Sequence, residues 1–180
     1  EGEANIYAHE ELISLLNGTA HSLLPEKDTR FIGRRLHLIP VADGEERQVI
    51  GRKTIFFDIH SAKAKQFGFA VSLGNGERLT CCGDEPYSEY ERSYAEKSKW
   101  LLHEAFCLHA QADIFHPYEK SHSTVKDAAI TAERLGVKNL LLYHTEDKNI
   151  ADRKSLYLAE GRKYFNGNIF VPDDLETIEL

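Results

Sequence analysis

Within one stretch, from residue 79 to residue 144, apolar runs with strand character end in side chains that can bind a metal. The ionisable side chains at these strand ends, and at one helix start, are Asp84, His103, Glu104, His122 and His144. Open α/β sheets bind ligands just beyond the carboxyl ends of strands, because the strand fixes the backbone while the following turn leaves the side chain free. This stretch therefore predicts both a fold class and the position of a site.

Strand and helix patterns alternate from residue 98 onward, which favours α/β layers over an all-β sandwich. The clearest helix begins at Thr124 and Asp127, which have the spacing of a capping box. The clearest hairpin turns at the Gly-Asn-Gly sequence of residues 74–76, since glycine and asparagine accept the positive φ of tight turns. We therefore expect an α/β fold that forms a single domain over residues 1–180.

The remaining sequence predicts several shorter elements. A strand is expected over residues 4–8, followed by a helix over residues 9–16 that Asn17-Gly18 closes. Further strands are predicted over residues 35–41, 48–50, 53–59, 168–171 and 177–179, and further helices over residues 87–97 and 152–165. The sequence contains no methionine, and a strand begins at residue 4, so we expect other residues to precede it.

Composition and charge restrict the class of protein. The 180 residues are 42% hydrophobic and 28% charged, as in an ordinary globular protein. No apolar run approaches the roughly 18 residues of a membrane-spanning helix, and no signal-peptide pattern opens the sequence. The net charge of -7, without a Lys/Arg stripe, argues against extensive nucleic-acid binding. Three cysteines, Cys81, Cys82 and Cys107, make a disulfide framework unlikely and favour a cytoplasmic location.

Three residues, His60, Asp84 and His144, each follow a strand-like run. Imidazole nitrogens together with a carboxylate suit zinc, manganese or iron. The same residues also have ordinary interpretations, because a single histidine is usually a surface or hydrogen-bonded core residue and Gly-Asp-Glu-Pro is typical of a turn. Spacing alone therefore leaves both a shared metal site and these ordinary roles open.

Four short motifs carry a more specific signal. They are Cys82-Gly83-Asp84-Glu85-Pro86, Leu102-His103-Glu104-Ala105, His122-Ser123-Thr124 with Asp127-Ala128-Ala129 following, and Leu142-Tyr143-His144. Their order and approximate spacing resemble those of metallo-β-lactamase-fold hydrolases, and among these the RNase Z branch. The resemblance extends over residues 54–147 and implies a metallo-β-lactamase-type αββα sandwich, of which this sequence would form the C-terminal two-thirds.

The resemblance implies a role for each matched residue. Asp84 matches an aspartate whose two oxygens bridge a pair of metals, and His144 matches a histidine that completes the shell of the second metal. His60, which precedes a Gly-aromatic strand, resembles the histidine that completes the shell of the first. His122 matches a catalytic histidine that contacts the scissile group and helps to move a proton to the leaving oxygen.

Four further polar residues have secondary places in this hypothesis. His103 and Glu104 would orient the ligands through hydrogen bonds. His109 and His116 lie between the two most specific motifs and are the alternatives if a ligand has been misassigned.

The sequence also departs from the family pattern. The family's His-x-His-x-Asp-His cluster is absent, so three predicted ligands remain where a dinuclear site needs about seven. The short distance in sequence between His60 and Asp84 leaves no room for the long basic arm with which RNase Z binds tRNA. Phe106 follows His103-Glu104-Ala105 where threonine is usual, and Glu85 also stands in place of a threonine.

We therefore expect the complete enzyme to be a metal-dependent hydrolase of phosphodiesters or other esters, using a water activated by two divalent metals, zinc first and manganese or iron as alternatives. This sequence alone would be inactive for lack of ligands. A non-catalytic interaction module and a mononuclear lactonase- or thioesterase-type hydrolase are the alternatives. We expect no membrane association, but either a homo-oligomer or a companion N-terminal segment, because a partial sandwich exposes sheet edges and apolar surface.

Overall fold

The computed structural model describes residues 2–180, and the chain divides after Glu45 into two compact units. The first unit contains β1 (Ala4–Ala8), α1 (Glu10–Leu23), α2 (Glu26–Thr29) and β2 (Leu36–Pro40). β1 and β2 pair in parallel. The helix predicted to close at Asn17-Gly18 continues to Leu23. A single interior glycine costs only about 1 kcal/mol relative to alanine, so it does not end a helix by itself.

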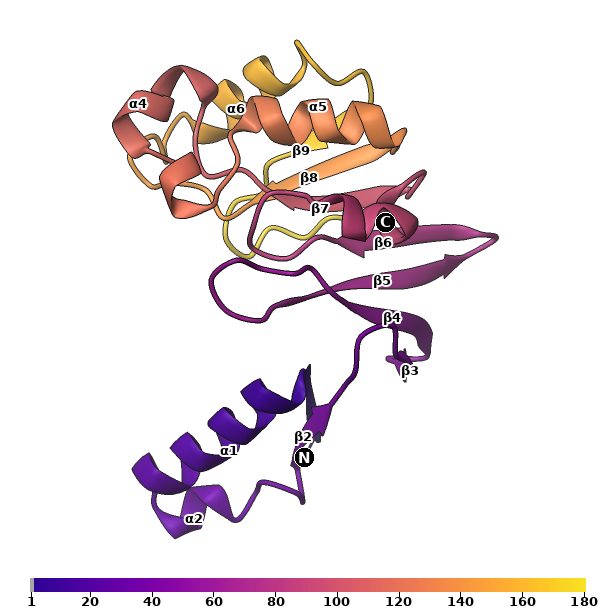
Figure 1. Cartoon of the computed structure of the whole chain (residues 1–180), viewed down its shortest axis with the longest axis vertical. Helices are drawn as coiled ribbons and strands as arrows, with labels where there is room; N and C mark the ends of the chain where they lie inside the picture. The colour runs from indigo at the N-terminus through magenta and orange to yellow at the C-terminus, as the bar shows by residue number, and fades with distance from the viewer. Residues whose placement is uncertain (1) are drawn as a thin grey trace. The chain divides into compact units, whose positions relative to one another are not determined.

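The second unit is built on a seven-stranded mixed sheet, in which the strands follow one another in chain order (Figure 1). Its strands are β3 (Glu46–Val49), β4 (Arg52–Asp58), β5 (Phe67–Gly74), β6 (Glu77–Cys81), β7 (Trp100–Glu104), β8 (Asn139–Tyr143) and β9 (Asn168–Phe170). β3 to β6 pair antiparallel, and β6 to β9 pair in parallel. β4, β6, β7 and β8 therefore run in one direction, and their carboxyl ends meet at the same edge of the sheet.

The second unit also contains four α-helices and three short 3-10 helices. The helices are η1 (Glu89–Glu91), α3 (Arg92–Ala95), η2 (His109–Gln111), α4 (Ala112–Phe115), η3 (Tyr118–Lys120), α5 (Val125–Leu135) and α6 (Arg153–Gly161). α5 has the predicted capping box at Thr124 and Asp127 and ends at Gly136, whose φ of 64° is left-handed. The α/β class and the 74–76 hairpin are likewise confirmed.

The main core lies between one face of the sheet and the helices. Leu101, Leu140 and Leu142 of the central strands are fully or almost fully buried against α5. Ala128, Ala129 and Ala132 form the inner side of α5, and these small side chains allow the helix to approach the sheet closely. A smaller cluster on β4 and β5 is covered by Tyr94, whose ring stacks on that of Phe57 at 4.2 Å.

The opposite face of the sheet carries an apolar row that follows the strand pairing across six strands. Its members are Phe56, Phe69, Cys81, Leu102, Leu141 and Phe170. Phe56 is buried, and the other five are only partly buried. A continuous apolar row of this kind is typical of a sheet face on which a further layer packs.

Two predicted elements differ from the structure. The helix predicted over residues 87–97 is reduced to η1 and α3, because the capping box of Ser88 and Glu91 sets its start and Glu96, with a ψ of 131°, leaves the helical conformation at its end. The strand predicted over residues 177–179 is not formed. The chain turns before that point, where the Asp173 N–H donates to Glu176 Oε2 at 2.9 Å. Within residues 2–180, no helix combines the length and apolar character needed to cross a membrane.

Candidate metal centre

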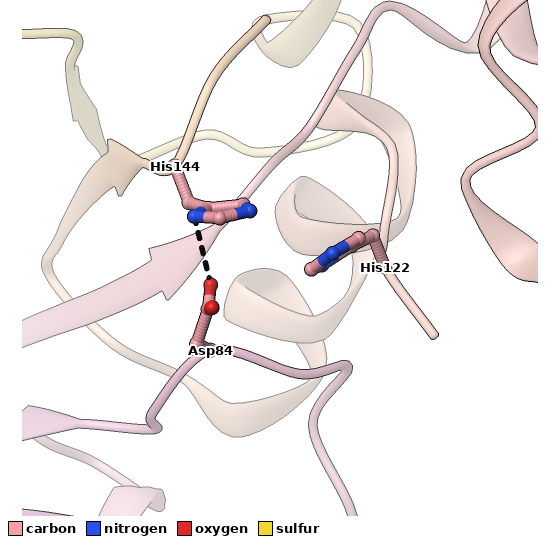
Figure 2. A group of neighbouring side chains, drawn as sticks. All are labelled: Asp84, His122 and His144. Atoms are coloured by element: carbon pink, nitrogen blue, oxygen red, sulfur yellow. Dashed lines mark ion pairs between the residues drawn. The ribbon is translucent and has the colours of Figure 1, made fainter. Parts of the chain in front are cut away.

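Asp84, His122 and His144 meet at the edge of the sheet where the parallel strands end (Figure 2). Asp84 follows β6, His144 follows β8 directly, and His122 lies in the turn before α5. Each residue offers one ligand atom, and these atoms lie within 4.8 Å of one another. The three side chains therefore form a group compact enough to surround one cation.

The three side chains contact one another, and one buried polar atom of the group is left without a hydrogen bond. Asp84 Oδ1 lies 3.0 Å from His144 Nδ1, and the rings of His122 and His144 stack with their centroids 4.7 Å apart. Asp84 Oδ1 is thus in ion-pair contact with His144, whereas the buried His122 Nδ1 lies 3.7 Å from Glu104 Oε2 and has no hydrogen-bond partner among the described residues. An unsatisfied buried polar atom costs about 1–3 kcal/mol, so it usually has a reason to be there. The feature of this group that suits a cation is the proximity of a carboxylate oxygen to two imidazole rings.

The donor set fits a divalent metal. Two imidazole nitrogens and one carboxylate oxygen suit zinc, manganese or iron. Catalytic zinc sites in proteins commonly use three protein ligands and leave the fourth position for water or substrate. The three residues can therefore hold one cation, whereas a second cation would need further ligands.

Glu104 lies behind His122. Its carboxylate accepts a hydrogen bond from the Ser123 N–H, and its Oε2 atom lies 3.7 Å from His122 Nδ1. Burial raises the pKa of Glu104 to about 7. Burial also lowers the pKa of His122, and the positive charges of Lys63 and His144 lower it further. Both shifts favour the neutral form of each side chain, so the contact is not a permanent ion pair.

His103 supports this corner of the site from the core. Its Nδ1 atom lies 2.6 Å from the Glu104 carbonyl oxygen, and burial lowers the pKa of the imidazole. A neutral imidazole can donate through Nδ1 and so hold the backbone at the end of β7. Glu104 thus contacts His122, and His103 contacts the backbone carbonyl of Glu104.

Phe106 is a residue of this site that the sequence noted only as a departure from the family pattern. Its ring lies 5.3 Å from that of His122 and 5.9 Å from that of His144, measured between centroids. Its N–H donates to Ser123 O, and its carbonyl accepts from the N–H of Glu146. Phe106 thus joins the turn of His122 to the turn of His144 through both its backbone and its ring.

The structure does not bring His60 into the group. His60 is exposed, its φ is 56°, and its ring packs on that of Tyr90 at 4.2 Å. Glu85 holds the loop that follows, because its carboxylate accepts from Ser61 Oγ at 2.6 Å and from the Ala62 N–H at 3.3 Å. The predicted ligand set was His60, Asp84 and His144, whereas the observed group contains His122 in place of His60.

The two alternative histidines also lie elsewhere. His109 Nε2 is 3.4 Å from Lys126 Nζ, and His116 Nδ1 is 3.3 Å from a carboxylate oxygen of Glu119. Neither belongs to the group formed by the described residues.

Tyr143 fixes the relation between two of the turns. Its hydroxyl donates to the Gly83 carbonyl oxygen, and it lies 3.6 Å from Cys81 Sγ. Burial raises the pKa of Tyr143, so the hydroxyl keeps its proton and remains a donor. The residue before His144 is thereby bonded to the residue before Asp84.

Comparison with known proteins identifies the fold. No family model matches the chain. The metallo-β-lactamase fold protein YhfI from Bacillus subtilis superposes with a TM-score of 0.70 and 16% identity, covering 96% of this chain and 64% of that one. The structure of Zn(2+)-bound PqqB from Methylobacterium extorquens gives a TM-score of 0.72 and 14% identity, covering 99% of this chain and 65% of that one. The chain has the metallo-β-lactamase fold.

Comparison of sequences finds curated relatives that are named ribonuclease Z. Ribonuclease Z from Bacillus thuringiensis is 33% identical over 105 residues, which are 58% of this chain and 33% of that protein. The chain therefore spans about a third of the length of the curated relatives it matches. The resemblance to the RNase Z branch, drawn from the four motifs, is confirmed by these relatives.

Proposed function

We propose that the protein is a metal-dependent hydrolase, or the part of one that carries Asp84, His122 and His144 as metal ligands. One observation supports this proposal above all others: Asp84, His122 and His144 each offer a ligand atom, and these atoms lie within 4.8 Å of one another. Zinc is the first candidate metal, since it is the ion named for the structural neighbour PqqB, and manganese or iron would also suit the donors.

A bound divalent cation would supply a water of lowered pKa as nucleophile and would stabilise negative charge on the substrate oxygen. The residues of the chain would position the reaction. Asp84 and His144 would hold the cation from two strand ends, and Glu104 would orient the imidazole of His122. A phosphodiester or another ester is the proposed substrate, from the similarity to RNase Z.

Three free cysteines, Cys81, Cys82 and Cys107, suit a reducing compartment such as the cytoplasm.

His122 has two candidate roles, as the third ligand or as the group that moves a proton to the leaving oxygen. The variant His122→Ala separates them. Loss of bound metal would make His122 a ligand, whereas retained metal with lost turnover would make it the proton donor. His60 remains a predicted ligand, although in the structure it packs on Tyr90.

Two metals would need ligands beyond the three proposed above. We propose that they come from a companion segment, which would also cover the apolar row from Phe56 to Phe170, or that this row pairs with a second copy of the chain. The row is partly buried at five of its six positions, as expected of a surface that packs on another layer. Light scattering and metal analysis would test this proposal. A protein that stays monomeric at high concentration, and whose metal binding does not increase when N-terminal sequence is added, would contradict it.

The test of the function begins with the metal. The purified protein is stripped with EDTA, titrated with Zn²⁺, Mn²⁺ and Fe²⁺ by calorimetry, and then assayed on a model phosphodiester, a lactone and a thioester. We expect one tightly bound cation, and hydrolysis of the phosphodiester once all ligands are present. Absence of binding for every metal would contradict the proposal and would favour a non-catalytic module, the second candidate, which the small number of ligands supports.

A further inference from the structure

The hydrogen bond from the Tyr143 hydroxyl to the Gly83 carbonyl oxygen connects the ends of two strands that are not adjacent in the sheet. β6, which leads to Gly83, and β8, which ends at Tyr143, are not neighbours in the sheet, because β7 lies between them. The Tyr143 hydroxyl nevertheless donates to the Gly83 carbonyl oxygen, with Cys81 Sγ 3.6 Å from the same hydroxyl. The bond therefore joins two strand ends that backbone pairing leaves unconnected.

Each of the two joined turns contains a residue with a positive φ. Gly83 has a φ of +76°, and a Cβ atom there would lie 2.9 Å from Ile59 Cδ1. His144 has a φ of 53°, which non-glycine residues rarely adopt. Glycine adopts a positive φ readily, but for His144 this conformation is strained and persists only where the surrounding contacts hold it. The Tyr143 hydroxyl is a contact placed between the two turns.

We propose that Tyr143 is a positioning residue whose hydroxyl sets the separation of Asp84 and His144 and so determines how tightly the group holds a cation. Tyr143 and Gly83 each immediately precede one of the two ligands. Movement at their hydrogen bond would therefore be passed directly to Asp84 Oδ1 and His144 Nδ1, which lie 3.0 Å apart. The inference rests on the proposed function, because it assumes that the group binds a metal.

The experiment compares Tyr143→Phe with the wild type in a titration with Co²⁺, a spectroscopic substitute for zinc. Removal of a residue that orients metal ligands typically weakens metal binding by about 10–100-fold, and we expect a loss in that range together with a changed visible absorption spectrum of the bound Co²⁺. Tyr94→Phe is the matched control. Tyr94 packs on Phe57 in the separate small cluster, so its Kd and spectrum should equal those of the wild type.

The outcomes separate the inference from the proposed function. If the wild type binds no Co²⁺, the metal-binding proposal fails and the inference fails with it. If the wild type binds Co²⁺ and Tyr143→Phe binds it with an unchanged Kd and spectrum, only the inference is overturned.

A folding defect in Tyr143→Phe is addressed by a second replacement. 4-Fluorophenylalanine at position 143 fills most of the space of the hydroxyl but cannot donate a hydrogen bond. Weakened Co²⁺ binding by this folded protein would support the positioning role. If neither replacement folds by circular dichroism, Tyr143 is required for the fold itself, and the positioning role is overturned.

Discussion

Asp84 Oδ1 lies 3.0 Å from His144 Nδ1, although β7 and α5 separate the two residues along the chain. The contact forms because β6 and β8 run in the same direction and end at the same edge of the sheet. Stacking of His122 on His144 then adds a third donor from the turn before α5. The proposed metal centre is therefore a product of strand direction and of one helix start.

Metal binding should stabilise the folded protein. A cation that binds only the folded state at about 100 times its Kd adds about 2.7 kcal/mol to the free energy of unfolding. For a chain of this size, that corresponds to a rise in Tm of roughly 5–10 °C. Differential scanning fluorimetry with Zn²⁺, followed by excess EDTA, checks the effect. A Tm that does not respond to either addition would mean that the group holds no metal in solution.

Asp84→Asn should remove the metal while leaving the fold intact. The substitution replaces a charged oxygen ligand with a neutral amide, and we expect the affinity for Zn²⁺ to fall by at least about 100-fold. Asp113→Asn, on the exposed surface of α4, removes the same charge and serves as the control. Metal content is measured by mass spectrometry after dialysis. Equal zinc in Asp84→Asn and the control would refute the assignment of Asp84.

Substitution of His122 should weaken the binding of a single Zn²⁺ ion much more than substitution of His60. His122→Ala removes one of the three grouped donors, whereas His60→Ala removes an exposed ring that packs on Tyr90. We expect a large loss of Zn²⁺ affinity in His122→Ala and a Kd within about threefold of wild type in His60→Ala. Calorimetry on both variants decides the matter. A large loss in His60→Ala would show that His60 leaves Tyr90 and binds the metal.

Glu91 should make the stability of the protein fall as the pH rises. Glu91 is 1% exposed, and burial raises its pKa from 4.5 to about 7. The folded state therefore holds a proton that the unfolded state releases, so this contribution is full below pH 4.5 and is lost as pH rises through 7. The shift amounts to about 3 kcal/mol between pH 4.5 and pH 8.

Glu91→Gln should remove most of this pH dependence, because a neutral amide can still accept from the Ser88 N–H. The free energy of unfolding is measured with urea at pH 5 and pH 8. Relative to the wild type, the variant is expected to be more stable at pH 8 than at pH 5. Glu89→Gln is the control, since Glu89 is exposed and its hydrogen bond to Arg92 lowers its pKa. An equal difference between wild type and Glu91→Gln at both pH values would show that Glu91 is not protonated in the fold.

The elements predicted well are those specified by local signals. The capping box of Thr124 and Asp127 marks the start of α5, and the turn at residues 74–76 marks the hairpin, so both appear where they were expected. The ends of α1 and α3 were missed. The cost of Gly18 in α1 is smaller than the stabilisation gained by continuing the helix, and α3 ends early because Glu96 leaves the helical conformation.

Contacts between distant parts of the chain explain where the site departs from expectation. Asp84 and His144 could be placed together because both follow strands of the same direction. The position of His122 depends on the turn in which its N–H donates to Pro117 O, and the position of His60 depends on Tyr90 and on the loop held by Glu85. None of these contacts leaves a periodic or spacing signal in the sequence.

The capped helix α5 and the loop after β4 flank the proposed metal centre, and we expect them to differ in their resistance to local unfolding. His122 is anchored at a helix whose first residue, Val125, is fully buried, and Gly136 closes the other end. Residues 62–65 of the loop are exposed, and Glu85 holds them from one side. Amide hydrogen exchange should therefore be fast in this loop and slow at the start of α5, so that opening of the site would begin on the side of the loop.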